Sequence, residues 1–343
     1  MAIDYPSLDN PTAGAFRFNT DSDQMEIYDG NQWTVVLSTS PYQQTGGDRG
    51  LFGGGLNAPN NAQSDVIDYI NASSTGNFTD FGNLTYGRQG IAAGASRTRA
   101  VWSSGGFPYS NVIDYITITS TGNASDFGDS TQNRRWGAGF SDTTRGIFAG
   151  GYSPTPANQT RYNIIDYVTI ASTGNANDFG DMNATTQDAA GCSSPTRGII
   201  AGGRTPTTVD TIEYVTISTT GNVADFGNLT AATYFADGAS NAVRGVIGGG
   251  YRSPAYTKEM NYVTIASQGD AVDFGDLVDK QENGGGGLGT NTRGIFSYGD
   301  APGSYGDHWC FVQIMTTGNA VKGGDLAQSR FGQRGTSNAH GGL

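Results

Sequence analysis

Few residues in this 343-residue sequence could do chemistry, and most of them recur. Asp-Phe-Gly, which binds magnesium in protein kinases, occurs five times, but neither a glycine-loop lysine nor a His-Arg-Asp sequence accompanies it. An active site is needed once, so a motif repeated this often indicates a structural role. GGGGLG at 284–289 lacks the Gly-Lys-Ser/Thr of a phosphate-binding loop, and we interpret it as a flexible loop.

The residues of a metal centre or a hydrolase are also missing. The two histidines, His308 and His340, are expected at the head of one strand and within the last strand, so they should not converge on a metal. No unrepeated pair of carboxylates stands out for glycoside hydrolysis. Cys192 and Cys310 fall at unrelated positions and are expected to be buried free thiols. We therefore predict no enzyme, no catalytic residue, no metal and no cofactor.

Composition and charge narrow the class of protein. The net charge of −12 disfavours nucleic acid and anionic membranes as partners, because both are bound by clustered Lys and Arg. No run of 18 apolar residues is present, so membrane insertion is not expected. The sequence MAIDYPSLDNPTAG has neither the basic region nor the apolar core of a signal peptide. Abundant Gly, Thr, Tyr, Ile and Val indicate strands and tight turns.

One glycine-rich phrase, Thr-Gly-Asn followed by Asp-Phe-Gly, defines six repeats. Its first glycine, preceded by Gln in one copy, stands at Gly76, Gly122, Gly174, Gly221, Gly269 and Gly318. Before it, each repeat has an Arg-Gly-apolar run (Arg-Ala in the second copy), which usually ends in a glycine pair, then a variable loop and a segment such as VIDYITI at 112–118. After it comes a segment such as RQGIAAGAS at 88–96. These apolar segments are short, β-branched or aromatic, and bounded by turn residues, which predicts four antiparallel strands per repeat.

The six repeats predict an all-β fold, a six-bladed β-propeller over 49–343. One four-stranded sheet of about 48 residues cannot cover both of its faces, whereas neighbours arranged radially can. The repeats begin with the second strand type and finish with the first. Arg330 follows Leu326 at the spacing at which Arg88 follows Leu84. The C-terminal strand is therefore expected to complete the first blade and close the propeller.

Repeated charges are predicted to join adjacent blades. Each aspartate of the Asp-Phe-Gly phrase precedes the arginine of the next Arg-Gly run by a nearly constant number of residues. The pairs are Asp80–Arg99, Asp126–Arg145, Asp178–Arg197, Asp225–Arg244 and Asp273–Arg293. We expect these pairs to form ion pairs across the boundaries between blades.

The repeat resembles that of the kelch family. The matching features, over 49–343, are the apolar run ending in Gly-Gly, the Ile-Asp-Tyr strand and the arginine that opens the next segment. The usual Trp of the fourth strand is replaced by Phe81, Phe127, Phe179, Phe226, Phe274 and Gly323. The resemblance implies an adhesive or scaffolding propeller. Galactose oxidase shares this architecture, but its copper chemistry needs two histidines that converge with tyrosines.

Residues 1–40 form a separate small module in this interpretation, joined to the propeller by a linker at 41–48. FRFNT, MEIYD and WTVV, separated by polar turns, predict three short antiparallel strands, too few to fold alone. The pattern around Phe18, Tyr28 and Trp33 resembles a module common in bacteriophage fibre and appendage proteins. The resemblance implies that these three residues belong to an anchoring module.

The loops between second and third strands are the predicted binding surface. They differ in length, carry aromatic residues and arginines, and emerge on one face of an up-and-down propeller. The candidates are Phe107, Tyr109, Tyr152, Arg161, Tyr162, Arg204, Tyr251, Arg252, Tyr256 and Tyr305. The alternative for each residue is that it is an ordinary loop residue with no role in binding.

The resulting hypothesis is a virion structural protein of a bacteriophage, a tail fibre or other appendage. It would be made in the host cytoplasm, released by lysis, attached to other virion proteins through residues 1–40, and homo-oligomeric, with a trimer expected. The propeller would bind a host-surface glycan or protein. A cellular kelch-like adhesion or scaffold protein is the alternative, and a carbohydrate-active enzyme is the third possibility.

Overall fold

The computed structural model describes residues 11–19, 24–35, 48–57, 60–155, 158–281, 284–301 and 304–343. These residues form strands and antiparallel sheets without a helix, as expected for an all-β fold, so none of them forms an apolar helix able to cross a bilayer. The chain divides into unit 1, Met1–Thr45, and unit 2, Gly46–Leu343, which are described separately. The predicted linker lies outside the described residues apart from Asp48.

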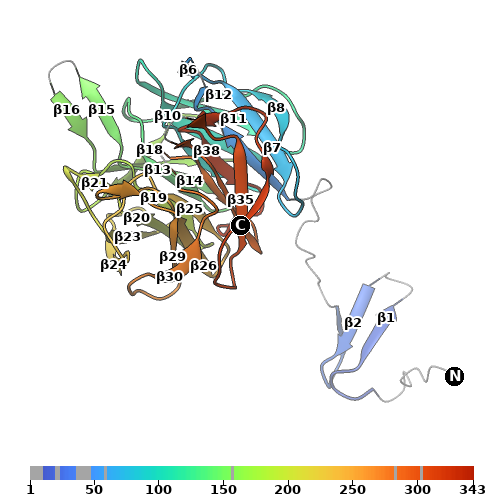
Figure 1. Ribbon diagram of the computed structural model, residues 1–343. Helices are drawn as coiled ribbons and strands as arrows, with labels where there is room; N and C mark the ends of the chain where they lie inside the picture. Colours follow the sequence, from blue (N-terminus) through green and yellow to red (C-terminus); the bar gives the residue numbers. More distant parts are fainter. Residues whose placement is uncertain are drawn as a thin grey trace. The chain divides into compact units, whose positions relative to one another are not determined.

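Unit 1 is a three-stranded antiparallel sheet (Figure 1). Its strands are β1 (Phe16–Asn19), β2 (Gln24–Tyr28) and β3 (Trp33–Val35), in the order β1-β2-β3. The Asp29 carboxylate accepts the N–H groups of Asn31 and Gln32 at 2.7 and 2.9 Å, which fixes the turn between β2 and β3. A polar turn between these two strands was predicted from the sequence.

Among its described residues, unit 2 contains six four-stranded antiparallel sheets. We number them by repeat and list the strands in spatial order. Sheet 1 is β38 (Arg334–Ser337), β4 (Arg49–Gly53), β7 (Val66–Asn71), β8 (Thr79–Asn83); sheet 2 is β9 (Ala92–Ala95), β10 (Arg99–Gly105), β11 (Ser110–Thr117), β12 (Ser125–Asp129); sheet 3 is β13 (Ala138–Ser141), β14 (Arg145–Ala149), β17 (Ile164–Thr169), β18 (Asn177–Asp181). Sheet 4 is β19 (Ala190–Ser193), β20 (Arg197–Ala201), β23 (Thr211–Thr216), β24 (Ala224–Asn228); sheet 5 is β25 (Asp237–Ser240), β26 (Arg244–Gly248), β29 (Glu259–Thr264), β30 (Val272–Asp276); sheet 6 is β31 (Gly287–Gly289), β32 (Arg293–Ser297), β35 (His308–Gln313), β36 (Val321–Asp325).

Short hairpins extend the connections between second and third strands. They are β5 (Leu56–Asn57) with β6 (Ala62–Gln63), β15 (Tyr152–Thr155) with β16 (Asn158–Arg161), β21 (Arg204–Thr205) with β22 (Thr207–Thr208), β27 (Tyr251–Arg252) with β28 (Ala255–Tyr256), and β33 (Asp300–Ala301) with β34 (Ser304–Tyr305). β37 (Arg330–Phe331) also pairs with β5.

The two ends of unit 2 are joined in sheet 1. β38 pairs with β4 in antiparallel register, with Arg334 opposite Gly53 and Ser337 opposite Gly50. The Asn338 side chain also accepts the N–H of Arg49 at 2.8 Å. This pairing is the one predicted from the spacing of Arg330, although His340 lies beyond the closing strand and not within it.

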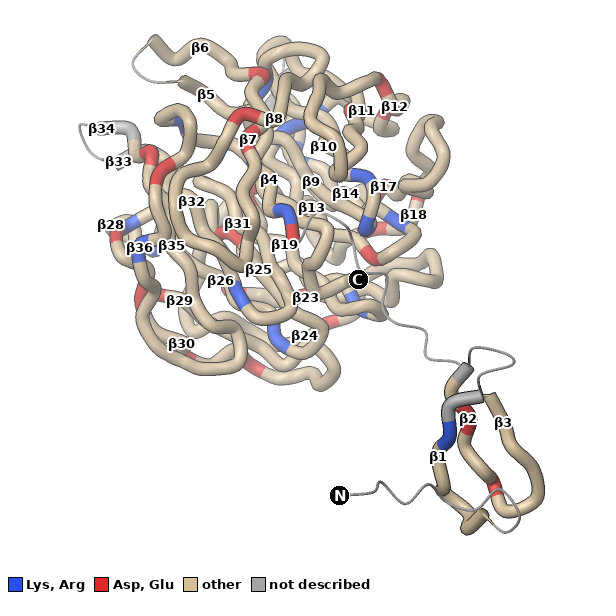
Figure 2. Tube along the Cα trace, turned by 90° about the vertical axis from the view of Figure 1, so that its right-hand side faces the viewer, with Lys and Arg blue, Asp and Glu red and all other residues tan. Residues whose placement is uncertain are grey.

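The first strand of each sheet contacts the first strand of the next sheet. β9 contacts β13, and the contacts continue through β19, β25 and β31 to β38, which in turn contacts β9. Figure 2 shows β9, β13, β19, β25 and β31 at the centre of unit 2 and the fourth strands β12, β18, β24 and β30 towards its periphery. Every sheet therefore has a neighbour on both sides, with sheet 6 beside sheet 1.

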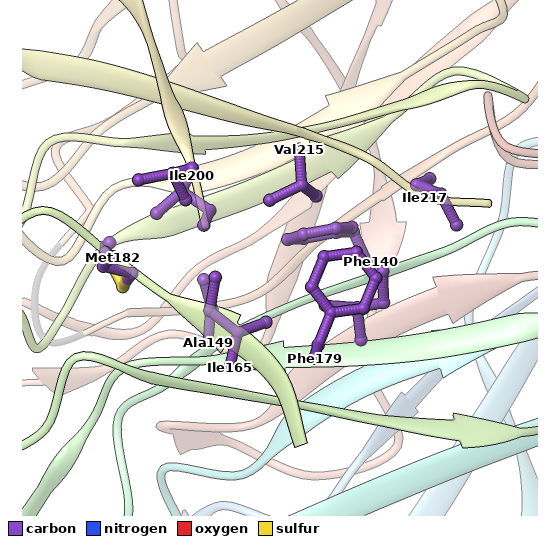
Figure 3. Packing of buried hydrophobic residues seen from close by; sticks show 12 residues of the cluster. Phe140, Ala149, Ile165, Phe179, Met182, Ile200, Val215 and Ile217 are labelled. Atoms are coloured by element: carbon purple, nitrogen blue, oxygen red, sulfur yellow. The ribbon is translucent and has the colours of Figure 1, made fainter. Parts of the chain in front are cut away.

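The hydrophobic core lies between neighbouring sheets. Figure 3 shows the cluster between sheets 3 and 4, in which Phe140 and Phe179 pack against Val215 and Ile217. A corresponding cluster between sheets 6 and 1 contains Trp309. Sheets with β-branched and aromatic residues on both faces need such neighbours, because neither face can be left in water.

The repeated glycine-rich phrase forms the joint between sheets. Gly122 of sheet 2 donates its N–H to the carbonyl of Phe81 in sheet 1 at 2.8 Å, and the Asn123 side chain accepts the N–H of Asn83 at 3.1 Å. Equivalent backbone bonds are Gly174–Phe127, Gly221–Phe179, Gly269–Phe226, Gly318–Phe274 and Gly76–Gly323. The phrase recurs because the same contact is made at every boundary, including that between sheets 6 and 1.

The Asp-Phe-Gly step lies inside the fourth strand of its sheet. A β-bulge shifts the register at this step, so that Ile113 faces Gly128 while Asp114 faces Asp126. In sheet 6 a glycine, Gly323, takes the phenylalanine position. A Cβ there would lie 2.2 Å from the Trp309 ring, so Trp309 occupies the space that the phenylalanine fills elsewhere.

The predicted Asp–Arg ion pairs are wrong. The aspartates are exposed, and no ion pair joins the predicted partners within the described part of unit 2. Arg99 instead donates to the carbonyls of Ile170 and Ala171 in the next sheet, at 3.2 and 2.8 Å, and its guanidinium stacks 4.8 Å from the centroid of the Tyr115 ring. Equivalent bonds are Arg49–Ile118, Arg145–Ile217, Arg197–Ile265, Arg244–Ile314 and Arg293–Ala72. The arginines do link sheets, but by satisfying backbone carbonyls that have no partner in their own ladder.

Substitutions at one joint test its tightness. Gly82 and Gly122 both have positive φ, 147° and 155°, but a Cβ on Gly82 would lie 2.3 Å from the Gly122 carbonyl oxygen, whereas one on Gly122 meets nothing within 4 Å. Both Gly→Ala variants carry a backbone penalty of about 1 kcal/mol. Gly82→Ala is expected to lose about 1–3 kcal/mol more, because the sheets must separate. Urea unfolding measures both, and equal losses would contradict the tight joint.

Candidate functional site

The loop end of unit 2 carries the predicted binding residues. We define it as the end where the chain passes from second to third strands and from fourth strands to the next first strand; antiparallel pairing brings these connections to the same end. The two kinds of connection pair directly through bridges between Arg135 and Tyr152, Gln187 and Arg204, and Tyr234 and Tyr251. Asp48, where the described part of unit 2 begins, bonds Ala72 at the opposite end, beside a Thr-Gly-Asn turn.

A groove of about 390 Å³ opens at the loop end of sheet 2. Phe107, Tyr109 and Tyr86 contribute aromatic rings to its wall, and Asn111 and Asn133 contribute amides. Phe107 is 69% exposed and packs edge-on to Tyr109, with 5.9 Å between ring centroids. Gln63 bonds both the N–H and the carbonyl of Phe107, so this exposed ring is held in place by its backbone.

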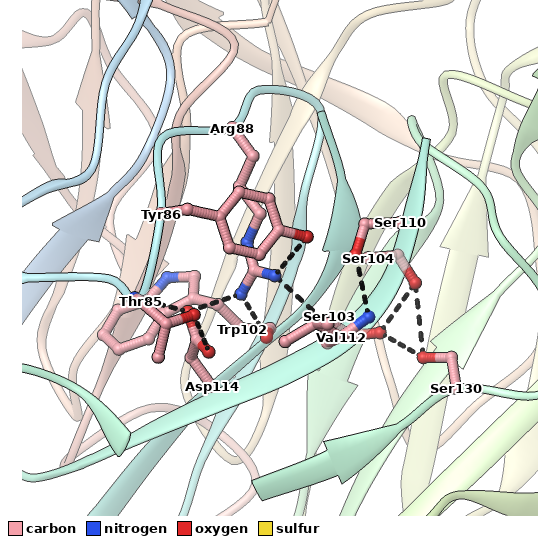
Figure 4. A network of polar contacts seen from close by, with 10 residues as sticks. All are labelled: Thr85, Tyr86, Arg88, Trp102, Ser103, Ser104, Ser110, Val112, Asp114 and Ser130. Carbon is pink, nitrogen blue, oxygen red and sulfur yellow. Dashed lines mark hydrogen bonds and ion pairs between the residues drawn. The ribbon is translucent and has the colours of Figure 1, made fainter. Parts of the chain in front are cut away.

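A buried ion pair supports one side of the groove (Figure 4). The Arg88 guanidinium donates to Asp114 at 2.7 Å, to the carbonyls of Val112 and Trp102, and to the Tyr86 hydroxyl at 3.3 Å. Thr85 donates two further bonds to Asp114. Because Arg88 and Asp114 are inaccessible to solvent, Tyr86 stands on a fixed base.

Arg135 is held by aromatic rings. Its guanidinium carbon lies 5.1 Å from the centroid of the Tyr109 ring and 5.8 Å from those of Tyr152 and Trp136. Two backbone hydrogen bonds to Tyr152 fix its main chain. Within the described residues its side chain donates no hydrogen bond and makes no ion pair, and its Nε is buried without a partner. The result is a positive charge that cation–π contacts orient and that no described carboxylate pairs with at ion-pair distance.

The aromatic contacts continue across sheets 3 to 5. Trp136 packs on Phe235, and Phe235 on Tyr234, with centroids 5.2 and 5.1 Å apart. Tyr234 packs on Tyr251, which packs on Tyr256, at 5.2 and 5.1 Å. We call this row, from Phe107 through Arg135 to Tyr256, the aromatic arc. It places five of the ten predicted binding residues, Phe107, Tyr109, Tyr152, Tyr251 and Tyr256, in one continuous set of contacts, with Arg204 4.7 Å from the Tyr234 ring.

Three members of this region have an unfavourable backbone conformation. Trp136, Asp188 and Phe235 each have φ of 60°, at the position where the other repeats have Gly90, Gly284 and Gly332. Each non-glycine residue costs of order 1 kcal/mol in this region of φ, more where the side chain is bulky. Glycine fits this position in the other repeats, so the three larger side chains are accommodated here at the cost of backbone strain.

Asp188 is a buried carboxylate next to arginines. Burial raises its pKa to about 6, and Gln187 and then Arg204 oppose the rise. Its Oδ2 accepts from Gln187 at 2.7 Å and lies 3.4 Å from Arg204, while its Oδ1 is buried without a partner. Such a group is ionised at neutral pH at the expense of stability.

Beneath the loop end, a cavity of about 60 Å³ lies between the first strands of all six sheets described. It is lined by small residues, since a Cβ on Gly191, Gly238 or Gly287 would meet a carbonyl oxygen of the preceding sheet within about 2.6 Å. At the far end His340 donates from Nε2 to the Ala95 carbonyl at 2.8 Å. Burial lowers the pKa of His340 to about 4, so this imidazole is neutral at physiological pH.

The remaining predicted residues do not join the aromatic arc. Arg161 donates to Gln187 at 2.9 Å, and Tyr162 is held by backbone bonds. Arg252 bonds Thr233, Glu259 and Asn261. Tyr305 lies in β34, but its side chain is outside the described residues.

In unit 1 two of the predicted anchoring residues share one face of the sheet. Tyr28 and Trp33 are paired across β2 and β3, with rings 5.4 Å apart, and Arg17 stacks on Trp33. Phe18 lies in β1 and its side chain is not among those described. The opposite face exposes Phe16 and Met25, which the sequence interpretation did not single out.

Sequence reasoning missed Arg135, Trp136, Asp188, Tyr234 and Phe235. All lie in connections from a fourth strand to the next first strand, which had been interpreted as plain repeat segments. The available signal was a departure from the repeat. Where three copies place a glycine, three others place Trp, Asp and Phe.

The cysteines and histidines of the described residues are not brought together in a reactive or metal-binding group. Cys192 and Cys310 are buried free thiols, as expected, and burial raises the pKa of Cys310 to about 11 and of Cys192 to about 12. His308 begins β35, where it stacks on Tyr298, far along the chain from His340 in the cavity. Within the described ranges no three His, Cys, Asp or Glu side chains form a group that could hold a metal ion.

Comparison with known proteins adds no family. No protein-family model matches the chain, and no curated protein matches it.

Proposed function

We propose that residues 49–343 form a six-bladed, kelch-like β-propeller. The support is that four kinds of contact each recur from sheet to sheet and again between sheets 6 and 1: first-strand packing, core clusters, the Thr-Gly-Asn joint and the arginine–carbonyl bond. An open stack would leave the outer faces of sheets 1 and 6 uncovered, at a large cost in exposed apolar area.

The function that we propose is host-surface recognition by a bacteriophage virion protein, a tail fibre or other appendage. Residues 1–40 would anchor the chain to other virion proteins, and the loop end would bind a host-surface glycan. The observation that carries the proposal is the aromatic arc, beginning at the groove beside Phe107 and Tyr109. Rigid aromatic rings beside amides, with Phe107 exposed, suit the apolar faces and hydroxyl groups of sugars. Asp48, the first described residue of unit 2, lies at the end of unit 2 opposite the loop end.

Binding to cells tests the recognition surface. Fluorescent full-length chain is expected to bind the bacterial cells infected by particles that carry it, and Phe107→Ala or Tyr109→Ala to weaken binding tenfold or more, as for a hot-spot aromatic residue. Met315→Ala, which trims a residue 51% exposed beside a Thr-Gly-Asn turn, is the matched control and should bind normally. Equal binding by all of these proteins would reject the groove as the site.

Association with purified particles tests the virion assignment separately. Antibody against unit 2 should label the particles, and deletion of residues 1–40 should abolish incorporation. A chain that binds cells but is absent from particles would favour the cellular adhesion protein. Turnover of a glycan by the isolated protein would favour the carbohydrate-active enzyme.

A further inference from the structure

Beside the groove lies a positive charge, on Arg135, that forms no ion pair within the described residues. Asn133 lines the groove and is exposed, Arg134 is buried against Asp166 at 2.8 Å, and Arg135 is half-buried among the rings of the arc. Arg135 does not itself line the groove, but its guanidinium carbon lies 5.1 Å from the centroid of the Tyr109 ring, which does.

The surroundings of Arg135 favour an anion as its partner. Tyr109 touches both features, since its ring lines the groove and lies under the Arg135 guanidinium. Asp188 interacts with Arg135 electrostatically, but it forms no ion pair with Arg135, and its Oδ2 is engaged by Gln187 and Arg204. In a chain of net charge −12, a guanidinium held by aromatic contacts with free hydrogen-bond donors is pre-organised for an oxyanion.

We propose that the loop end binds an acidic glycan, with sugar rings stacked on Phe107 and Tyr109 and an anionic substituent paired with Arg135. This inference rests on the proposed recognition function and specifies its ligand. A carboxylate and a phosphate present the same paired oxygens to a guanidinium, so either could be the anionic substituent. A neutral glycan would leave Arg135 desolvated without compensation, which gives the site its selectivity.

Titration calorimetry with matched probes tests the proposal. Tetragalacturonate is compared with its methyl ester, and pentamannose phosphate with pentamannose, using the full chain. At least one acidic probe is expected to bind ten times or more tightly than its neutral match, and added salt should reduce the difference. The pair that shows the difference identifies the anion as carboxylate or phosphate.

Three variants assign the effect to Arg135. Arg135→Gln should bring the acidic-to-neutral affinity ratio close to one, and Arg135→Lys, which keeps the charge but loses the planar fork, should give an intermediate ratio. Arg161→Gln removes an arginine of the same end that is already bonded to Gln187, and should leave the ratio unchanged. If Arg135→Gln unfolds, Arg135→Lys still supplies the readout.

The outcomes separate this inference from the recognition function. Acidic and neutral probes that bind equally, with both affinities lost in Phe107→Ala, would overturn the acidic glycan and keep the recognition surface. An acid preference that survives in Arg135→Gln would overturn the role of Arg135. Binding of none of the four probes would also overturn the inference, while cell binding would still test recognition.

Discussion

Arg330→Met is expected to destabilise unit 2 by about 3–5 kcal/mol, the usual cost of removing one partner from a buried ion pair. Arg330 and Asp68 are both inaccessible to solvent and lie 2.7 Å apart, and Arg330 also donates to the carbonyls of Val66 and Phe52. Burial raises the pKa of Asp68 and the charge of Arg330 opposes the rise. Without the guanidinium, an ionised carboxylate would remain buried in sheet 1, where the two ends of unit 2 meet.

Two further variants distinguish the charge effect from lost packing. In Arg330→Met/Asp68→Asn the uncompensated charge is gone, so a large part of the loss should be recovered. Arg88→Met breaks the corresponding pair in sheet 2 but should cost less, since Thr85 still donates two bonds to Asp114, whereas Asp68 Oδ1 has no partner. Urea unfolding followed by tryptophan fluorescence measures all three. A loss below about 1 kcal/mol in Arg330→Met would contradict the assigned role.

Removing two buried groups separately, in His340→Gln and in Asp188→Asn, is expected to change the pH dependence of the free energy of unfolding in opposite directions. The pKa of His340 is lowered from 6.5 to about 4, first by burial and then by Arg97, against the Ala95 hydrogen bond and Asp142. Below pH 6.5 the His340 imidazole therefore binds a proton in the unfolded chain, whereas in the folded chain it binds one only near pH 4. Stability falls over this interval as pH falls, by about 3 kcal/mol.

Asp188 has the opposite effect. Its folded pKa of about 6 exceeds the ordinary value of 3.8, so the folded chain binds the proton first and stability rises as pH falls from 7 to 4. This contribution is also about 3 kcal/mol. Asp188→Asn removes the cost of the buried charge, keeps a residue that tolerates positive φ, and should be more stable than the wild type at pH 7 by about 2–3 kcal/mol.

Urea unfolding at pH 4, 5, 6 and 7 measures the free energy of unfolding of the wild type, His340→Gln and Asp188→Asn. Relative to the wild type, His340→Gln should gain stability as pH falls and Asp188→Asn should lose its advantage. Asp68, Glu213 and Asp237, whose pKa values burial also raises, are common to all three proteins and do not affect the differences. Parallel pH profiles for the three proteins would show that neither group titrates as its surroundings require.

The repetitive part of the structure was predictable because local and repeated signals agree. Apolar runs bounded by glycine specified the strands, and Arg330 at the position of Arg88 specified how β38 would pair with β4. The partners of the repeated arginines could not be predicted in this way. Arg99 donates to the backbone carbonyl of Ile170, and any residue type can supply such a carbonyl. The sequence therefore does not identify the partner, and the aspartate that recurs at a nearly constant spacing was chosen wrongly.

The candidate site was only partly predictable, for a related reason. Insertions in the loops drew attention to Phe107, Tyr109 and Tyr251, which do lie in the arc. Arg135 and Trp136 sit in a connection of ordinary length, and their importance comes from the rings gathered around them from other repeats. Contacts between segments so distant along the chain become visible only once the sheets are assembled.

The pairing of β38 with β4 has a consequence for synthesis on the ribosome. β4 emerges near the start of unit 2, whereas β38 follows some 280 residues later, as the register of Arg334 with Gly53 requires. Throughout translation of the intervening repeats, the nascent chain carries a strand edge with unpaired N–H and C=O groups, open to pairing with another chain. A polypeptide released before Arg334 would keep that open edge permanently, so premature termination should yield aggregates and not a smaller working protein.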